Sequence, residues 1–438
     1  MEFNKENDDY KSENNHSSNH KITSLNIEVP LSNHSNDVEK NKKTNKSLYI
    51  KIVIAIIYFI LIIGIEQAYR KALYDKSVKA QVDIRKDYTK ESIFYQFWKF
   101  MSLFGIAGVT FPIFSIIFLF FPLSSSFLTL QILIYSIYIT NLFKIIYRNG
   151  RPYWESDILD LVCNSGYGNP SGHSVTSTAY YLTLPHIITN LELFRKDIKG
   201  KVLSIIIFCL FIILGALVII SRVILAAHSI NQVIYGFTLG LGIYFVEIYI
   251  LSYHTYKPHE FINHITNFLT VLIYMIFHLS ILILLIIIYF VLGDEQTIKY
   301  NIEKDIFNEK RCKIKNEYLM LKHEGFFQGL AITAILGAHL GIILLVYLLK
   351  KNNYNINGYI TQFNNSSIKK WLIRLPILLI SGIFIILYFC VPGDSPLSII
   401  FIFKSSLSFF LTTLGIYFVG IFICIYYNFA NECIVRNL

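Results

Sequence analysis

Residues 201–222 read KVLSIIIFCLFIILGALVIISR, a nearly uninterrupted apolar run with a cation at each end. About 20 consecutive apolar residues are enough for a helix to cross a bilayer. Because lipid offers backbone N–H and C=O groups no hydrogen-bond partner, such a segment has to be helical. Similar runs recur along most of the chain, so the sequence predicts an all-α fold, a polytopic membrane helical bundle.

The composition of the whole chain agrees with a membrane location. Its 438 residues are 54% hydrophobic, 16% aromatic and only 16% charged. A soluble domain has roughly 25% charged residues, so this chain has too few polar side chains to cover a water-facing surface. This excludes a soluble enzyme, a disordered scaffold and a disulfide-stabilised secreted module. The net charge of +10 is spread over the loops, so we expect the lipid bilayer and no nucleic acid as a partner.

The composition divides the chain into four parts. Residues 1–47 are rich in Asn, Ser, Lys, Asp and Glu, which predicts a disordered tail. The apolar run at 48–68 is expected to be an additional N-terminal transmembrane anchor. Residues 69–430 form the main membrane domain, and 431–438 a short C-terminus.

Ten transmembrane spans are expected, or nine if the first lies flat on the membrane surface. Their approximate limits are 48–68, 98–121, 126–146, 173–192, 202–222, 229–252, 266–292, 327–349, 371–391 and 397–428. They are separated in places by a charged, amphipathic segment at 69–95, a glycine-bearing loop at 147–172 and a polar loop at 293–326. Lys and Arg are almost evenly divided between the two sides, so charge does not decide the orientation.

Three short motifs hold the ionisable residues of a candidate site. They are KIIYRNGRP at 144–152, PSGH at 170–173 and SRVILAAH at 221–228. Because the spans at 173–192 and 202–222 form a hairpin, all three motifs return to one membrane face. Three cations and two imidazoles would then meet at one aqueous mouth: Lys144, Arg151, Arg222, His173 and His228.

That set of side chains suits phosphoryl transfer, in which dispersed negative charge has to be held in place. Arg151 and Arg222 can each bind two oxygens, and Lys144 adds a point charge. Ser171 and Gly172 precede a helix, where backbone N–H groups favour an anion. One imidazole would attack phosphorus while the other protonates the leaving oxygen. No carboxylate cluster accompanies them, so we expect neither a metal nor another cofactor.

Each motif alone has a plainer structural interpretation. A histidine near a helix end is often structural, and Lys or Arg at the end of a span commonly extends toward the lipid headgroups. PSGH alone could be a turn followed by a helix with Ser as its N-cap. The order of the three motifs and their common face favour the phosphate site.

The three motifs resemble the signature of the phosphatidic acid phosphatase type 2 (PAP2) superfamily. By matched position, this resemblance implies that His228 is the nucleophile and His173 the proton donor. It also implies that phosphate is held by Lys144, Arg151, Ser171, Gly172 and Arg222. The superfamily usually has Asp four residues after the nucleophile, where this chain has Gln232. A neutral amide can still orient the imidazole, but it stabilises imidazolium less than a carboxylate does.

Gln232 is typical of one branch, the glucose-6-phosphatases. The third motif here is similar to that branch's, as are RPYW at 151–154 and the glycine-spaced run from Cys163 to His173. The likeness covers about residues 70–430. It implies a PAP2 membrane domain of the glucose-6-phosphatase type over 69–430.

This resemblance implies metal-independent hydrolysis of a sugar phosphate, foremost glucose 6-phosphate, through a phosphohistidine, as in gluconeogenesis. It implies an integral membrane protein of the endoplasmic reticulum with a lumenal active site, cytosolic termini and, as a possible partner, a sugar-phosphate transporter. Two alternatives stay open. One is a phosphatase of the same superfamily acting on phosphatidate or a sphingoid phosphate; the other is an inactive binding or transport protein with the same fold.

Residues outside the motifs bear on these alternatives. Stacking groups and acceptors suited to a sugar stand beside the first motif: Tyr153, Trp154, Glu155, Asp157 and Asp160. An apolar gap between helices would instead suit a lipid tail. Cys163 and Cys312 could pair or stay free thiols. Ionisable groups within transmembrane spans often have a functional role. In this sequence such groups are Glu247, His278, His339 and Lys404.

Overall fold

The computed structural model describes residues 34–86, 91–105, 107–121, 123–156, 159, 166–189, 198–251, 258–292, 325–351 and 399–420. All regular structure in these ranges is helical, with 11 α-helices. This confirms the predicted all-α class. Residues 1–49 and 50–438 form two compact units. In the first unit the described residues, from His34 on, are helical.

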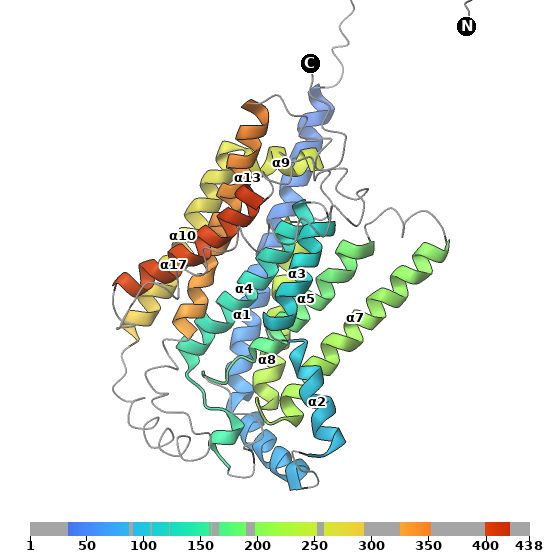
Figure 1. Ribbon diagram of the computed structural model, residues 1–438, viewed down its shortest axis with the longest axis vertical. Coiled ribbons are helices and arrows are strands. Elements are labelled where there is room, and N and C mark those ends of the chain that lie inside the picture. The colour runs from blue at the N-terminus through green and yellow to red at the C-terminus, as the bar shows by residue number, and fades with distance from the viewer. Residues whose placement is uncertain are drawn as a thin grey trace, which may run out of the picture. The chain divides into compact units, whose positions relative to one another are not determined.

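The helices follow one another in the order shown in Figure 1. They are α1 (His34–Lys86), α2 (Ile93–Leu103), α3 (Ala107–Phe120), α4 (Leu123–Tyr147), the short 3-10 helix η1 (Pro152–Trp154), α5 (Gly172–Thr189), α7 (Ile198–Ile224), α8 (Ile230–Phe245), the π-helix η3 (Val246–Leu251), α9 (Pro258–Thr266), α10 (Phe268–Val291), the 3-10 helix η5 (Leu330–Ile332), α13 (Thr333–Lys351), α17 (Ile399–Leu414) and the π-helix η8 (Gly415–Gly420).

Seven helical segments of the described residues are long and apolar enough to cross a membrane. Each overlaps a predicted span, and together they are Ser47–Lys86, Leu123–Trp154, Ile198–Ile224, Ile230–Leu251, Phe268–Val291, Gly325–Lys351 and Ile402–Val419. Helix α5 covers the predicted span at 173–192 but is not among the seven, since its sequence contains several Ser and Thr residues. The span predicted at 371–391 lies outside the described residues.

One predicted span is wrong. The span expected at 98–121 is two helices, α2 and α3, because a turn at Phe104–Gly105 ends the first. A Cβ at Gly105 would lie 2.7 Å from both His173 Cδ2 and Val218 Cγ1, so α5 and α7 pack closely against this turn. The charged, amphipathic segment expected at 69–95 is helical as far as Lys86, since α1 continues to that residue without a break.

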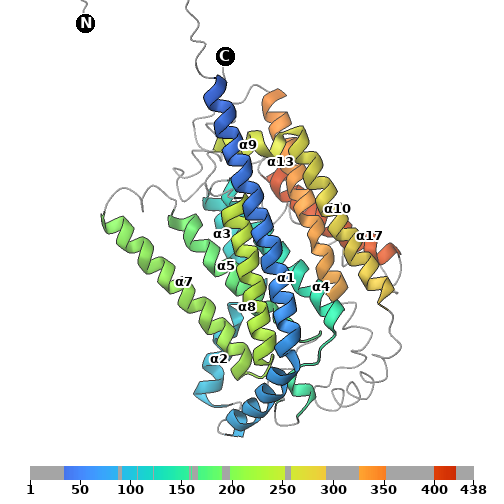
Figure 2. The same ribbon diagram turned by 180° about the vertical axis from the view of Figure 1, so that it is seen from behind.

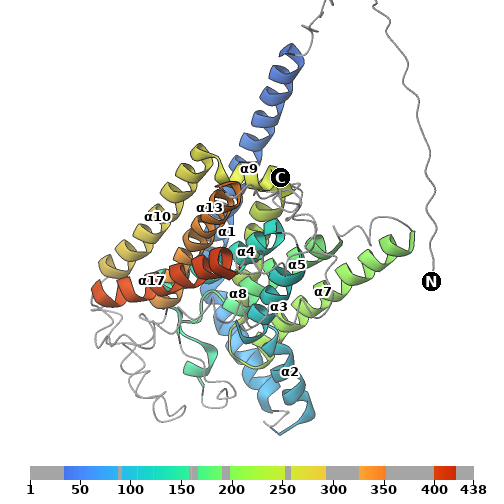
Figure 3. The same cartoon turned by 45° about the horizontal axis from the view of Figure 1, so that its top comes forward.

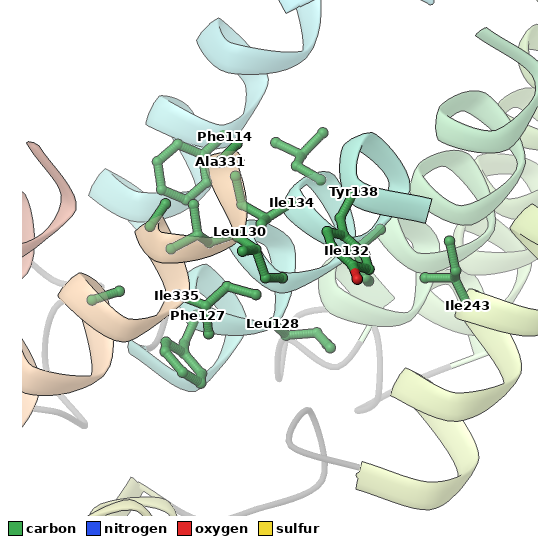
Figure 4. Packing of buried hydrophobic residues seen from close by; sticks show 14 of the residues in the cluster. Phe114, Phe127, Leu128, Leu130, Ile132, Ile134, Tyr138, Ile243, Ala331 and Ile335 are labelled. Carbon is green, nitrogen blue, oxygen red and sulfur yellow. The ribbon is translucent and has the colours of Figure 1, made fainter. Parts of the chain in front are cut away.

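The core of the second unit lies where α3, α4, α8 and α13 meet. Figure 4 shows buried side chains of α4, among them Phe127 and Leu130, packed against Phe114, Ile243 and Ile335 of the other helices. In a bilayer, helices associate by such close packing and by interhelical hydrogen bonds rather than by the hydrophobic effect. The cluster therefore sets how the helices are placed.

The helices form two groups within this unit. Helices α10, α13 and α17 lie together on one side, whereas α5 and α7 lie on the other (Figures 1, 2 and 3). Helix α5 packs against α4, α7 and α8. As a result, the end of α4, the start of α5, the end of α7 and the start of α8 lie at the same end of the bundle.

Candidate active site

The structure brings the predicted site residues to this common end. Lys144 lies in the last turn of α4, and Arg151 directly precedes η1. Gly172 and His173 begin α5, while Arg222 lies in the last turn of α7. His228 occupies the turn between α7 and α8, and Gln232 stands in the first turn of α8.

His228 is buried, and its two ring nitrogens have different partners. Nδ1 lies 2.8 Å from the Gly168 carbonyl oxygen and 3.3 Å from Gln232 Oε1. Both partners are acceptors, so Nδ1 carries the proton and donates it. Nε2 is therefore unprotonated and lies 3.1 Å from Arg151 Nη1, which donates to it. In this tautomer the lone pair of the ring is on Nε2, where it accepts from Arg151.

Arg151 is a buried cation that connects three parts of the site. Its Nε donates to the Gly166 carbonyl at 2.7 Å, and its Nη1 donates to the Ala227 carbonyl at 3.0 Å. The same Nη1 faces His228 Nε2. The guanidinium group thus holds the chain before η1, the loop before α5 and the turn after α7 in one arrangement.

Gln232 lies near His228 but has other hydrogen bonds as well. Its Oε1 accepts from the Ser229 N–H at 3.2 Å, which completes a capping box at the start of α8. Its Nε2 donates to the Gly150 carbonyl at 2.7 Å. The shorter contact to His228 Nδ1 comes from Gly168, which the motifs did not predict.

Only glycine fits at position 168. A Cβ there would lie 2.5 Å from Gln232 Nε2 and 2.6 Å from the Gly150 carbonyl oxygen. The Gly168 N–H also donates to the Asn149 carbonyl at 2.8 Å. The sequence signal for this residue was the glycine-spaced run before PSGH, which located the loop without assigning it a contact.

Arg222 is the second buried cation, 2% exposed. Its Nη1 donates to Ser102 Oγ of α2, while its Nε has no partner among the described residues. An unpaired buried donor is costly, and an oxygen of a bound phosphate would supply the missing acceptor. Ser102 was not predicted, because α2 carries no motif.

The charges of the site act on both histidines. Burial lowers the pKa of His228 well below its usual range, and so do the positive charges of Arg151, Arg222 and Lys144. The same three cations lie within electrostatic range of His173. The cations of the three motifs therefore lie around both imidazoles, and together with burial they disfavour the protonated form of His228.

Ser171 differs from the expectation that its backbone binds the anion. Its N–H donates to the Gln232 carbonyl at 3.0 Å, and its Oγ accepts from Ser174 Oγ at 3.0 Å. The N–H groups of Gly172 and His173, in the first turn of α5, have no intrahelical acceptor. These two groups are the ones placed to bind an anion at the start of α5.

Helix α1 supplies residues that sequence reasoning missed. Gln81 Nε2 donates to the carbonyls of Val223 and His228, both at 2.8 Å. Ser77 Oγ accepts from the Ile230 N–H at 2.8 Å. These bonds hold the turn that carries His228. The available signal was a pair of polar residues four positions apart, on one face of a helix.

A buried carboxylate of α1 holds the loop before α5. Glu66 forms an ion pair with Arg70 and accepts from Asn169 Nδ2 at 2.8 Å. Arg70 in turn lies 4.0 Å from the centre of the Tyr147 ring. Because Asn169 precedes Pro170 and Ser171 directly, Glu66 helps to fix the start of the PSGH motif.

The residues expected to contact a sugar are placed differently. Tyr153 and Trp154 are buried, 2% and 3% exposed, and pack in a cluster with Tyr167 and Ala226. These two side chains therefore present almost no surface to solvent, whereas Glu155 is exposed. Asp157, Asp160, Cys163 and Cys312, which the sequence also singled out, lie outside the described residues.

The three motifs of this site lie within a stretch of the chain that matches a known protein family. Residues 126–256 match the model of the PAP2 superfamily. The match runs from α4 into the segment after η3 and includes all three motifs. We found no match among curated proteins and none among solved structures. Residues 126–256 of this membrane protein thus form a phosphatase-type domain of the PAP2 superfamily.

Proposed function

We propose that this protein is a membrane-bound phosphomonoesterase of the glucose-6-phosphatase type. It would hydrolyse a sugar phosphate, foremost glucose 6-phosphate, to free sugar and phosphate. The phosphatase activity is proposed because the unprotonated Nε2 of His228 lies beside the donor groups of Arg151. The unpaired Nε of buried Arg222 belongs to the same cluster of charges.

The proposed reaction has two steps. In the first, His228 Nε2 attacks phosphorus, the bond to the ester oxygen breaks, and His173 gives its proton to the leaving oxygen. In the second, His173 takes a proton from water, which attacks the phosphohistidine and releases phosphate. Lys144, Arg151, Arg222 and the start of α5 would bind the phosphoryl oxygens, whose charge these donors balance. No metal takes part in either step.

Gln232 is the feature that supports a sugar phosphate over other esters. Here an amide stands where most of the superfamily has Asp, as in glucose-6-phosphatases. The structure gives a physical reason why an amide suffices, since the Gly168 carbonyl already accepts the proton of His228 Nδ1. The branch also implies a site in the endoplasmic reticulum lumen and a sugar-phosphate transporter as partner, and we include both in the proposal.

A lipid-phosphate phosphatase is the second candidate. The observation that favours it is the burial of Tyr153 and Trp154, which removes the side chains expected to stack on a sugar. The mechanism would be the same, with phosphatidate or a sphingoid phosphate as the ester.

The experiment is phosphate release by the full-length protein purified in detergent, with a chelator and no added metal. Glucose 6-phosphate, mannose 6-phosphate and a short-chain phosphatidate are compared, with His228→Ala as the control. Preference for glucose 6-phosphate, lost in the variant, supports both substrate and nucleophile. Preference for phosphatidate selects the second candidate, and release from none of the three contradicts both.

A further inference from the structure

A cavity of about 510 Å³ lies between α1, α4, α8, η3 and α10. Its size is typical of a site for a small ligand. The cavity is distinct from the candidate active site, because its residue Glu247 lies about 25 Å further along the α8–η3 segment than Ile230. Apart from Glu247, the wall consists of apolar and aromatic side chains, including Phe59, Ile273 and Phe277.

Glu247, one of the residues that line this cavity, has a carboxyl group without a partner. It is 1% exposed, and neither of its oxygens has a hydrogen-bond partner among the described residues. It lies in the π-helix η3, and π-helical turns occur frequently at functional sites. Burying a carboxyl group without partners costs free energy of folding. A ligand that donates a hydrogen bond to this group, or carries a positive charge, would offset that cost.

The polar side chains near Glu247 are already paired with one another. His278 Nδ1 donates to the Tyr274 carbonyl at 2.7 Å, so its Nε2 is unprotonated and accepts from the Tyr135 hydroxyl at 2.8 Å. The hydroxyl proton of Tyr135 is thereby engaged, and its oxygen accepts a hydrogen bond from the Gln131 side chain. Among the described residues, the unpartnered acceptors of the cavity lining are therefore the two oxygens of Glu247.

The protein supplies no cation to Glu247 from the residues that line the cavity. Lys51 lies near the rim, but its Nζ donates to the Tyr249 carbonyl at 2.9 Å. Aromatic side chains do line the cavity, namely Phe59, Tyr135, Tyr274 and Phe277. Aromatic faces attract organic cations, so both the acceptors and the rings favour an ammonium group.

The exposed part of the wall indicates how a ligand would enter. Ile273 and Phe277 of α10 are 57% and 50% exposed, and α10 is one of the candidate membrane spans. Apolar side chains exposed on such a span face lipid. The cavity thus leads from a lipid-facing apolar rim to a buried carboxyl group, and its occupant needs an apolar body with one polar end.

We propose that this cavity binds a membrane-soluble long-chain primary amine, with its ammonium group on Glu247 and its alkyl chain directed toward α10. The acceptors select the charged end, and the apolar wall selects the chain. This site is independent of the phosphatase proposal.

The test uses full-length protein in phosphatidylcholine nanodiscs and a dodecylamine analogue with a photoreactive group in its chain. Labelled peptides are identified after irradiation, with dodecylamine or dodecanol as competitors. We expect labelling in η3 and α10 that dodecylamine prevents and dodecanol at the same concentration does not. In Glu247→Gln, dodecylamine should compete at least tenfold more weakly, whereas Asp83→Asn, an exposed acid on α1, should behave like the wild type.

A second pair of variants covers the case in which Glu247→Gln does not fold. Ile139→Trp fills the cavity and should reduce labelling, while Ile283→Trp, on the lipid-facing side of α10, should not. Equal competition by dodecanol, unchanged competition in Glu247→Gln, or unchanged labelling in Ile139→Trp would each overturn the proposal. Phosphate release is measured on the same samples, so its absence would bear only on the phosphatase proposal.

Discussion

At the scale of single residues, the two ring nitrogens of His228 have different hydrogen-bond partners. Nδ1 donates to the Gly168 carbonyl and Nε2 faces Arg151. In the superfamily pattern a carboxylate orients the corresponding histidine, whereas here a backbone carbonyl does so, together with the side-chain oxygen of Gln232. The imidazole is thus oriented without a negative charge, and burial and the surrounding cations lower its pKa.

The two histidines should differ in their effect on the phosphoenzyme. His228→Ala removes the nucleophile, so no labelled phosphoprotein should form in rapid-quench experiments. His173→Ala removes only the acid, which contributes about 10²–10⁴-fold in such reactions. It should still form the phosphoenzyme from 4-nitrophenyl phosphate, whose leaving group needs no proton. A labelled intermediate in His228→Ala would contradict the assignment.

The lowered pKa of His228 predicts the pH dependence. Only the neutral imidazole attacks, so kcat/KM should follow a bell-shaped curve whose acidic limb lies below the reference value of about 6.5. Lys144→Met removes one of the cations that lower this pKa. The acidic limb should therefore move to higher pH, by up to about one unit. Profiles measured with one substrate in both proteins check this, and a shift to lower pH would refute it.

Gly168 offers a test of the carbonyl that orients His228. In Gly168→Ala the new methyl group meets Gln232 and the Gly150 carbonyl, so the loop has to move and its carbonyl leaves Nδ1. We expect kcat to fall by at least about tenfold, the cost of one lost hydrogen bond with its geometry. Gly64→Ala is the control, since a Cβ there meets nothing within 4 Å.

At the scale of elements, α1 links the two loops of the site. Glu66 holds the loop before α5 through Asn169, and Gln81 holds the turn before α8 through two carbonyls. This helix lies outside the residues that match the PAP2 superfamily. Residues outside the matched domain therefore complete the arrangement of residues within it.

Gln81→Leu should lower kcat more than it raises KM. The substitution leaves the carbonyls of Val223 and His228 without their donor, so His228 loses its fixed position while the phosphate-binding cations stay. We expect a loss of about thirtyfold in kcat, from roughly 1 kcal/mol for each of the two hydrogen bonds. Lys79→Leu, exposed on the same helix, serves as the control. An equal loss in both variants would mean that α1 has no positioning role.

At the scale of the whole molecule, every α1 contact described at the site begins at Glu66 or later. Deletion of residues 1–47 should therefore leave phosphate release and thermal stability in detergent nearly unchanged. Deletion of residues 1–69 removes Glu66 and should abolish release. Comparison of the two purified truncations checks this, and a strong loss in the shorter deletion would contradict it.

Much of this arrangement could be predicted because it is encoded locally. Hydropathy alone indicates the helical spans, and three contiguous motifs identify the cations and imidazoles that the structure brings together. The contacts of Glu66, Gln81 and Gly168 could not be predicted, since each depends on a partner distant in the chain. The turn at Phe104–Gly105 escaped prediction because apolar residues flank it on both sides.

The bond between Gln81 and the His228 carbonyl joins residues 147 positions apart. At a synthesis rate of about 5–20 residues per second, roughly 7–30 seconds separate the emergence of these two residues from the ribosome. Throughout this interval, α1 has been made and its polar side chains lack their final partners. During membrane insertion, α1 thus stays without these partners until the turn after α7 has been synthesised. Any factor that shields the polar side chains of α1 in the translocon has to release them at that stage.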